Sequence, residues 1–259
     1  MGSPPAKSHP YGDLRAVREL MIEAGLCRGV VNQNVGRIVR AFRWAASEEL
    51  VSAEIWSGLR ALPGLKAGRT RAHERPSVQP VADELVDATL LELSPTVRAM
   101  VELQRSTGMR PAEVCSVRPV DVDRSGDVWV FHPVEHKTQH HGKERSVFIG
   151  PRGQEVLRPF LSRAVEEYCF RPTRAASIVK AARRYRVDSY RRAIQRACER
   201  AGVERWSPNQ LRHSFATRAR AAYGLEAAQV LLGHSCARIT EVYAERDAAK
   251  GIAAAKAIG

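Results

Sequence analysis

The sequence predicts a mainly α-helical protein with one small antiparallel β-sheet, an α+β fold. Most of the 259 residues show apolar side chains at helical spacing, with Pro, Gly and capping residues where helices should begin and end. Two segments of strand composition, "DVWVFHP" and "RSVFIG", lie within 127–149 and predict a hairpin or small meander. The length is sufficient for one large domain or two modest ones.

A first helical unit is predicted for residues 1–63. Apolar side chains recur at helical spacing over 13–24 and over 30–50, and a short third helix follows from Ser52. Three arginines of the second helix lie away from its apolar stripe and are candidates for contacts with phosphate groups. A solvated helix face is the alternative interpretation. These arginines are Arg37, Arg40 and Arg43.

Residues 64–80 are predicted to form a linker. This stretch contains prolines, glycines and four basic residues against one acidic residue. A basic linker can lie along a nucleic-acid backbone. The candidate contacts are Lys66, Arg69 and Arg71.

The second predicted unit covers residues 81–259. Helices are expected near 82–92 and 95–106, and a short helix should start at Pro111, after Gly108 has ended the preceding one. After residue 151 the pattern is mostly helical. Within it, "SPNQLRHSFATRAR" begins a helix that Ser207 can cap, with Gln210 as the capping-box partner.

Charge indicates a polyanionic partner. Lys and Arg number 41 against 28 Asp and Glu, a formal charge of +13, and a strongly basic protein most often binds nucleic acid. A highly charged soluble surface is the alternative. The basic residues are densest over 171–192, where eight face one Asp, and Arg183 and Arg184 are candidate DNA contacts there.

Cysteine usage and hydropathy limit the compartment. The five cysteines are scattered without a CxxC pair, which favours a reducing compartment over a disulfide scaffold or a zinc finger. No apolar run approaches the roughly 18 residues of a membrane span, and the N-terminus has no signal-peptide pattern. The sequence therefore predicts a cytoplasmic protein without a membrane partner.

Five dispersed residues suggest phosphodiester chemistry. Arg110 precedes a Pro-initiated helix and Arg212 lies near another helix start, so each could present a bidentate fork to a phosphate. Lys137 lies in the hairpin loop and could deliver a proton, while His234 follows a helix end and Tyr243 comes nine residues later. Each residue alone is compatible with an ordinary surface or packing position.

The ordered set of motifs resembles a known family. "TGMRPAEVCSVRPVDVD", a hairpin lysine, "LRHSFATRA", "LLGHS" and "ITEVYAERD" resemble the tyrosine recombinases, the phage-integrase family, over about 80–247. The resemblance implies a tyrosine-recombinase catalytic fold for the second unit. The first unit resembles the later part of the family's core-binding domain, and its opening helices are expected to be missing because few residues precede Asp13.

The resemblance also implies residue roles. Arg110 and Arg212 would hold the scissile phosphate, and Tyr243 would attack it to leave a 3′-phosphotyrosyl bond and a free 5′-hydroxyl. Lys137 would protonate that leaving oxygen, with Lys143 as the rival. His234 would donate a hydrogen bond to the phosphate or to the tyrosine oxygen. Glu113 would orient Arg110, although Glu113 could instead be an ordinary exposed residue of an amphipathic helix.

The implied activity is site-specific cleavage and rejoining of double-stranded DNA by a tetramer assembled on the DNA. The bond energy is kept in the protein–DNA link, so the resemblance implies no cofactor, ATP or metal ion. The chain departs from the family at Asn209, where a histidine is usual three residues before the second arginine. An amide cannot take up a proton, so we expect Asn209 to hydrogen-bond the phosphate or the tyrosine, with His234 or water as the base.

Three other interpretations remain open. The chain could be a catalytically impaired DNA-binding remnant of a mobile element, or it could relax supercoils as a type IB topoisomerase does. A metallohydrolase is suggested by "HKTQHH", but these histidines lack the carboxylate spacing of a metal site.

His213 is adjacent to Arg212, and because one residue turns a helix by about 100°, we expect the His213 side chain to point away from the site.

Overall fold

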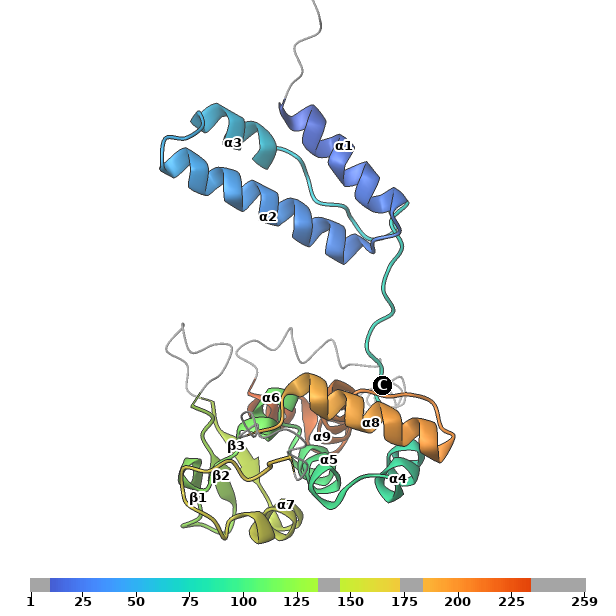
Figure 1. Cartoon of the computed structure of the whole chain (residues 1–259), viewed down its shortest axis with the longest axis vertical. Helices are drawn as coiled ribbons and strands as arrows, with labels where there is room; N and C mark the ends of the chain where they lie inside the picture. Colours follow the sequence, from blue (N-terminus) through green and yellow to red (C-terminus); the bar gives the residue numbers. More distant parts are fainter. Residues whose placement is uncertain (1–9, 135–144, 173–183, 234–259) are drawn as a thin grey trace, which may run out of the picture. The chain divides into compact units, whose positions relative to one another are not determined.

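The computed structural model describes residues 10–134, 145–172 and 184–233. The chain divides into two compact units, Met1–Ser77 and Val78–Gly259, and each is considered by itself (Figure 1). The division falls within the stretch that the sequence predicts as a linker.

Three helices form the first unit. They share a small apolar core in which the buried residues are Leu14, Val31, Val35 and Leu59. All three helices that the sequence predicts are present, and the first begins three residues earlier than expected. The bounds are α1 (Pro10–Glu23), α2 (Arg28–Ser47) and α3 (Ala53–Arg60).

The segment after α3 is held against the helices of this unit. The side-chain amide of Asn32 donates to the carbonyl of Leu65 over 3.0 Å and accepts from its N–H over 2.8 Å. The backbone N–H of Arg28 donates to the carbonyl of His73, and Ala72 is buried. Residues 64–80 contain no helix or strand, but these bonds make the part up to His73 a strap on the first unit rather than a free linker.

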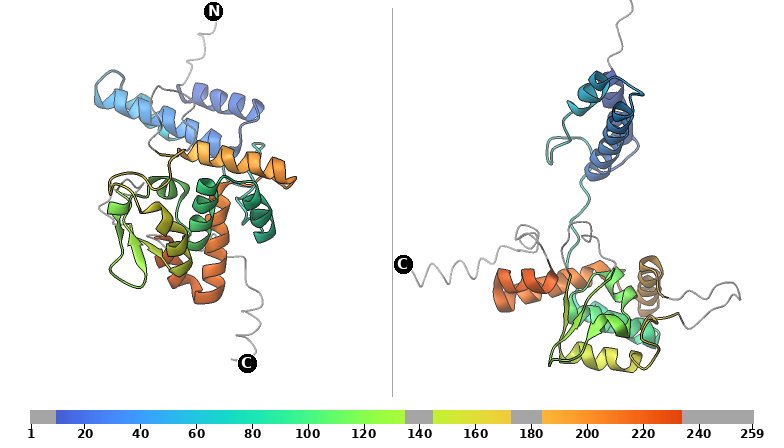
Figure 2. Two further views of the ribbon diagram at one scale, coloured as in Figure 1. Left: turned by 60° about the horizontal axis from the view of Figure 1, so that its bottom comes forward. Right: turned by 90° about the vertical axis from the view of Figure 1, so that its left-hand side faces the viewer.

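The second unit surrounds one central helix. Helix α5 packs against α6, α7, α8 and α9, and the three-stranded sheet lies beside it (Figure 1). The core includes Met100 and Leu103 of α5 together with side chains from the sheet and α8. Figure 2 shows α9 reaching beyond the helices around it. The helices are α4 (Asp83–Leu91), α5 (Pro95–Thr107), α6 (Pro111–Ser116), α7 (Pro151–Leu157), α8 (Val187–Ala201) and α9 (Pro208–Leu232), with short 3₁₀ turns η1 (Pro119–Asp121) and η3 (Arg158–Phe160).

The predicted hairpin is part of an antiparallel sheet with the strand order β1-β2-β3. Val122 pairs with Phe131, and Trp129 pairs with Ile149. The two strands with clear composition are the two that the sequence predicts, whereas the third is only two residues long. Their bounds are β1 (Val122–Asp123), β2 (Trp129–Phe131) and β3 (Val147–Ile149).

Two details differ from the expected helical pattern after residue 151. Residues 161–172 contain no helix. Helix α9 is interrupted at Gly224, whose φ of 83° and ψ of −179° are not helical. The pattern therefore predicts α7, α8 and α9 but neither the irregular segment nor the interruption.

Candidate active site

The turn between α5 and α6 presents Arg110. Helix α5 ends at Gly108, which has a left-handed φ of 65°. A Cβ on Gly108 would lie 2.2 Å from the ring of Phe215, so both the backbone conformation and the available space require glycine. Arg110 is the N-cap residue of α6, and Pro111 occupies the first turn, as the sequence predicts.

Buried side chains hold the carbonyl groups of this turn. The Gln104 amide donates to the Met109 carbonyl over 3.1 Å and accepts from the Tyr190 hydroxyl over 3.0 Å. Arg212 donates from Nη1 to the Gly108 carbonyl over 2.7 Å. The backbone that carries Arg110 is therefore fixed from α5, α8 and α9 together.

Glu113 contacts Arg110 in two ways. Its Oε2 accepts from the backbone N–H of Arg110 over 2.6 Å, and its Oε1 accepts from Nη1 over 2.7 Å. Glu113 is 3% exposed, so the alternative of a solvated helix face does not describe it, while the Arg110 side chain is 33% exposed. The carboxylate can thus orient a guanidinium that still reaches solvent, which is the geometry that the predicted role requires.

A second arginine, Arg145, reaches the same carboxylate. Its Nε lies 3.3 Å from Oε1 of Glu113, and both side chains are buried. Burial alone would raise the pKa of Glu113, but the charge of Arg145 and the charge and hydrogen bonds of Arg110 lower that pKa below its ordinary value. Burial lowers the pKa of Arg145, which the charge of Glu113 opposes. Glu113 is therefore ionised at neutral pH.

Arg212 connects the start of α9 to two other backbone segments. Its Nη1 donates to the Gly108 carbonyl and its Nη2 donates to the Leu232 carbonyl, each over 2.7 Å. The side chain is 4% exposed. Leu232 is the last residue of α9, so Arg212 holds the segment before Arg110 and the helix end that precedes His234.

The start of α9 has the capping box that the sequence predicts. The Gln210 side chain accepts from the Ser207 backbone N–H over 2.9 Å. One turn later, Nδ2 of Asn209 lies 3.4 Å from Nε2 of His213. The sequence predicts that the His213 side chain points away from the site, but it lies on the same helix face as Asn209, because residues four apart share a face.

His213 can accept a hydrogen bond from Asn209. Burial and the neighbouring charge of Arg212 lower the pKa of the His213 imidazole, which is therefore neutral at pH 7. A neutral ring has one acceptor nitrogen, and Nε2 faces the amide donor of Asn209.

Several predicted residues lie outside the described part of the chain. These are Lys137 with its rival Lys143, His234, Tyr243, Arg183 and the histidines of "HKTQHH". Their roles stay predictions.

The other candidate DNA contacts lie on surfaces. Arg37, Arg40 and Arg43 are exposed on α2, on a different side from the buried Val31 and Val35. In the strap, Lys66 and Arg69 are exposed, and exposed Arg71 pairs with Glu19 over 3.1 Å. The guanidinium of Arg184 lies 5.2 Å from the centre of the Tyr168 ring.

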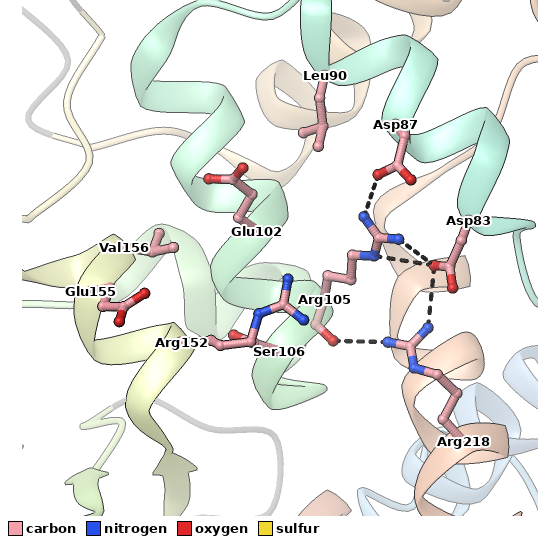
Figure 3. Close-up of a pocket in the computed structure, with 10 residues that line it drawn as sticks. All are labelled: Asp83, Asp87, Leu90, Glu102, Arg105, Ser106, Arg152, Glu155, Val156 and Arg218. Atoms are coloured by element: carbon pink, nitrogen blue, oxygen red, sulfur yellow. Dashed lines mark hydrogen bonds and ion pairs between the residues drawn. The ribbon is translucent and has the colours of Figure 1, made fainter.

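A cavity of about 540 Å³ lies away from these residues, between α4, α5, α7 and α9 (Figure 3). Arg105 pairs with Asp83 over 2.7 Å and with Asp87 over 2.5 Å. Arg218 approaches Asp83 at 3.4 Å and donates to the Arg105 carbonyl over 3.0 Å. No predicted site residue that the structure describes lines the cavity. Its ion pairs connect α4, α5 and α9.

Two features are absent from the residues that the structure describes. They contain no cluster of three or more His, Cys, Asp or Glu side chains that could hold a metal ion. None of the helices in these residues has an apolar stretch of the length that a membrane span requires.

Sequence comparison decides the family. The sequence model of the phage integrase family matches residues 80–250, more than half of the chain. The chain belongs to the phage integrase family, the tyrosine recombinases. This match includes Arg110, Glu113, Arg145 and Arg212, and the predicted family resemblance is confirmed.

Relatives and solved structures agree with the family. Tyrosine recombinase XerC of Corynebacterium glutamicum is 31% identical over 146 residues, which are 56% of this chain and 45% of that protein. XerC of Corynebacterium efficiens is 26% identical over 244 residues, 89% of this chain and 72% of that protein. The chain thus spans only about half the length of some curated relatives, 45% and 47% in two cases.

The fold agrees with that of a transposon integrase. The Tn1549 transposon integrase, in complex with a circular intermediate DNA, superposes with a TM-score of 0.70 at 16% identity, covering 96% of this chain and 86% of that one. At this identity the likeness concerns the fold alone. The predicted α+β fold, a tyrosine-recombinase catalytic fold with a helical unit before it, is confirmed.

Proposed function

We propose that this protein is a site-specific DNA recombinase or integrase, which cleaves and rejoins double-stranded DNA through a 3′-phosphotyrosyl intermediate. The observation that supports it most directly is the joining of the two predicted phosphate-binding arginines by one short turn. Arg212 bonds the carbonyl of Gly108, two residues before Arg110. The family and the DNA complexes of the Tn1549 integrase support the same proposal.

The two arginines stabilise the transition state of strand cleavage. When the tyrosine oxygen attacks phosphorus, negative charge accumulates on the non-bridging oxygens, and guanidinium groups fixed beforehand stabilise it without reorganising. Arg110 suits direct contact because its guanidinium is partly exposed while Glu113 holds its orientation. Arg212 is buried against backbone carbonyls, so it also fixes the frame around the phosphate.

The bond changes balance without a cofactor. A bond forms between the Tyr243 oxygen and phosphorus, the bond from phosphorus to the 5′-oxygen breaks, and Lys137 donates a proton to that leaving oxygen. Rejoining is the reverse attack by a 5′-hydroxyl. The phenol proton passes to His234 or water, because the amide of Asn209 cannot accept it.

Binding is attributed to the basic side chains of both units. Arg37, Arg40 and Arg43 on α2 and the lysine and arginines of the strap contact phosphates in this proposal, as do Arg183 and Arg184. The protein assembles on DNA as a tetramer and works in the cytoplasm. Its four described cysteines are buried free thiols, which fits a reducing compartment.

Asn209 favours one second candidate, a DNA-binding remnant with an impaired site. A family member that lacks the usual imidazole could bind target DNA without cleaving it. The presence of Arg110, Arg212, Lys137, His234 and Tyr243 in the sequence favours the active enzyme.

Covalent trapping tests the proposal. The full chain is incubated with a pool of randomised duplexes that carry nicks, denatured, and the DNA that stays attached is sequenced. We expect an adduct on a restricted set of sequences from the parent protein, none from Tyr243→Phe, and an unchanged yield from Tyr223→Phe. Tyr223 is a matched control, because it is a tyrosine of α9 that is 75% exposed and lies outside the proposed machinery.

Each other outcome selects an alternative. Sequence-specific DNA binding without an adduct indicates the impaired remnant. An adduct from Tyr243→Phe contradicts the assignment of Tyr243 as the nucleophile. On a separate substrate, closed circular supercoiled DNA, relaxation without sequence preference indicates a topoisomerase. Strict dependence of cleavage on Mg²⁺ indicates a nuclease. With chelator present, we expect the adduct yield to be unchanged.

A further inference from the structure

Arg145 is a buried charge that the proposed reaction has not yet used. It lies just before β3, and its side chain is 4% exposed. Its Nη2 is buried and has no hydrogen-bond partner among the residues that the structure describes. Burying a guanidinium is costly unless other groups compensate its charge, so its contacts should reveal what it stabilises.

The first contact of Arg145 is an acid that already holds Arg110. Its Nε lies 3.3 Å from Oε1 of Glu113, the same oxygen that accepts from Nη1 of Arg110. One carboxylate therefore lies between two guanidinium groups, one of them buried and the other partly exposed. The buried arginine compensates the carboxylate, and the exposed one keeps donors that face outward.

The second set of contacts is with the end of α9. Nη1 of Arg145 donates to the Ser146 carbonyl over 2.8 Å and lies 3.4 Å from the Leu231 carbonyl. A Cβ on Gly233 would lie 2.2 Å from the same Nη1, so the guanidinium fills the space that a side chain at 233 would need. Gly233 has a left-handed φ of 60°, and His234 is the next residue.

We propose that Arg145 is a positioning residue of the reaction, which fixes Glu113 against Arg110 and fixes the Leu231–Gly233 corner from which His234 follows. The inference rests on the proposed function. A single planar group with donors on two sides can bond both parts at once, whereas a lysine supplies one point charge. Displacing Arg110 or His234 by about 1 Å can slow a reaction by about 10²-fold.

Single-turnover cleavage of the trapped target duplex tests this role. We expect Arg145→Met to slow cleavage by about 10²-fold at saturating protein and Arg145→Lys by about tenfold. The matched control is Arg118→Met, because Arg118 also pairs with an acid three residues along, Asp121, over 2.7 Å. Arg118 lies outside the proposed machinery, so its variant should cleave within about threefold of the parent.

A pH profile separates positioning from general stability. The charged groups that face Glu113 are Arg145 and Arg110. Without Arg145, burial still raises the pKa of Glu113 while a charge that lowered it is gone. The acid limb of the cleavage rate should therefore move to higher pH in Arg145→Met, and Arg118→Met should not move it.

A double variant tests whether Arg145 acts through Glu113. Residues that act as one unit give effects that do not multiply. We expect Arg145→Met combined with Glu113→Gln to be within about threefold of the slower single variant, and to lose the shifted acid limb. Removing both charges also leaves no unpaired buried ion, so this variant should fold even where Arg145→Met does not.

The outcomes are distinguishable. If the parent gives no adduct, the proposed function fails and this inference fails with it. If the parent cleaves DNA, three results overturn the inference alone: Arg145→Met cleaves as fast as the parent, its acid limb does not move, or its effect on the rate multiplies with the effect of Glu113→Gln in the double variant. If Arg145→Met does not fold by circular dichroism, Arg145→Lys decides: lysine keeps the charge but not the donors on two sides, so cleavage about tenfold slower with an unmoved acid limb supports the role, and cleavage at the parent's rate overturns it.

Discussion

Helices α6 and α9 both begin beside an arginine that the proposed reaction needs, but the two arginines are held by different kinds of group. At α6, Arg110 is 33% exposed and is held by the Glu113 carboxylate, which Arg145 also contacts. At α9, Arg212 is 4% exposed and donates to two backbone carbonyls, those of Gly108 and Leu232. The orientation of Arg110 therefore depends on a titratable side chain, whereas the orientation of Arg212 depends on backbone carbonyl groups.

Because the two arginines are held differently, removing the Arg212 side chain should have different consequences from removing the Arg110 side chain. Two carbonyls lose a charged donor if the Arg212 side chain is removed, and hydrogen bonds to charged groups stabilise a protein more than neutral ones do. Removing the Arg110 side chain leaves Glu113 still paired with Arg145. Arg212 should therefore matter for both folding and chemistry, and Arg110 mainly for chemistry.

The largest expected effect comes from Arg212→Met and Arg110→Met. Both should slow cleavage on the order of 10²-fold or more, because each removes a donor to the charged transition state. Arg212→Met should also lower the free energy of unfolding by about 3 kcal/mol, and Arg110→Met by about 1 kcal/mol or less. Urea unfolding followed by circular dichroism measures the difference. Equal losses of stability would break the comparison.

A smaller effect is expected from Glu113→Gln. The amide keeps the shape but not the charge that orients Arg110, so we expect cleavage to slow by about tenfold at pH 7. The folded-state pKa of Glu113 is below its ordinary value of 4.5. Its stabilising contribution is therefore present above pH 4.5 and is lost as the pH falls through the folded-state value.

Unfolding curves measured at acid pH check whether the stabilising contribution of Glu113 is lost as the pH falls. The free energy of unfolding of the parent should fall more steeply below that pH than the free energy of Glu113→Gln. The stability lost in Arg212→Met should be the same at pH 7 and pH 8, since backbone carbonyls do not titrate and the His213 imidazole, whose pKa is lowered by burial and by the charge of Arg212, is neutral at both. A loss that differs between pH 7 and pH 8 would contradict the distinction between the two helix starts.

The two helix starts also show what sequence can predict. The pairing of Arg110 with Glu113 is three residues apart and follows from helical spacing, as does the capping box of Ser207 with Gln210. The contact of Arg145 with Glu113 spans 32 residues, and the contact of Arg212 with Gly108 spans 104. Such contacts depend on how α5, α6, α9 and the sheet pack, which local periodicity does not encode.

The same reasoning explains the elements. Long amphipathic helices have enough residues to show a period, and those predicted within the residues that the structure describes are present. The two-residue strand β1 is too short for any pattern. The strap after α3 has linker composition, yet Asn32 and Arg28 fasten it to the first unit. A basic residue just before a strand, such as Arg145 before β3, has no local sequence feature that indicates its burial.

The smallest expected effect concerns Asn209. Its amide faces the neutral imidazole of His213 and can still bond a phosphate or phenol oxygen, because Nδ2 carries two hydrogens. Asn209→Ala leaves that oxygen without a partner, and we expect cleavage to slow severalfold. Asn209→His adds a proton acceptor, so we expect a gain of about tenfold or less, with a new dependence on pH near the value of about 6.5 for free imidazole. Single-turnover rates from pH 5 to 8 measure the effect of both Asn209 variants, and His213→Gln is the control for the contact between the two side chains.

The result for Asn209→Ala decides whether Asn209 belongs to the site. If this variant cleaves as fast as the parent, Asn209 has no part in the site, and the start of α9 contributes to the chemistry through Arg212 alone.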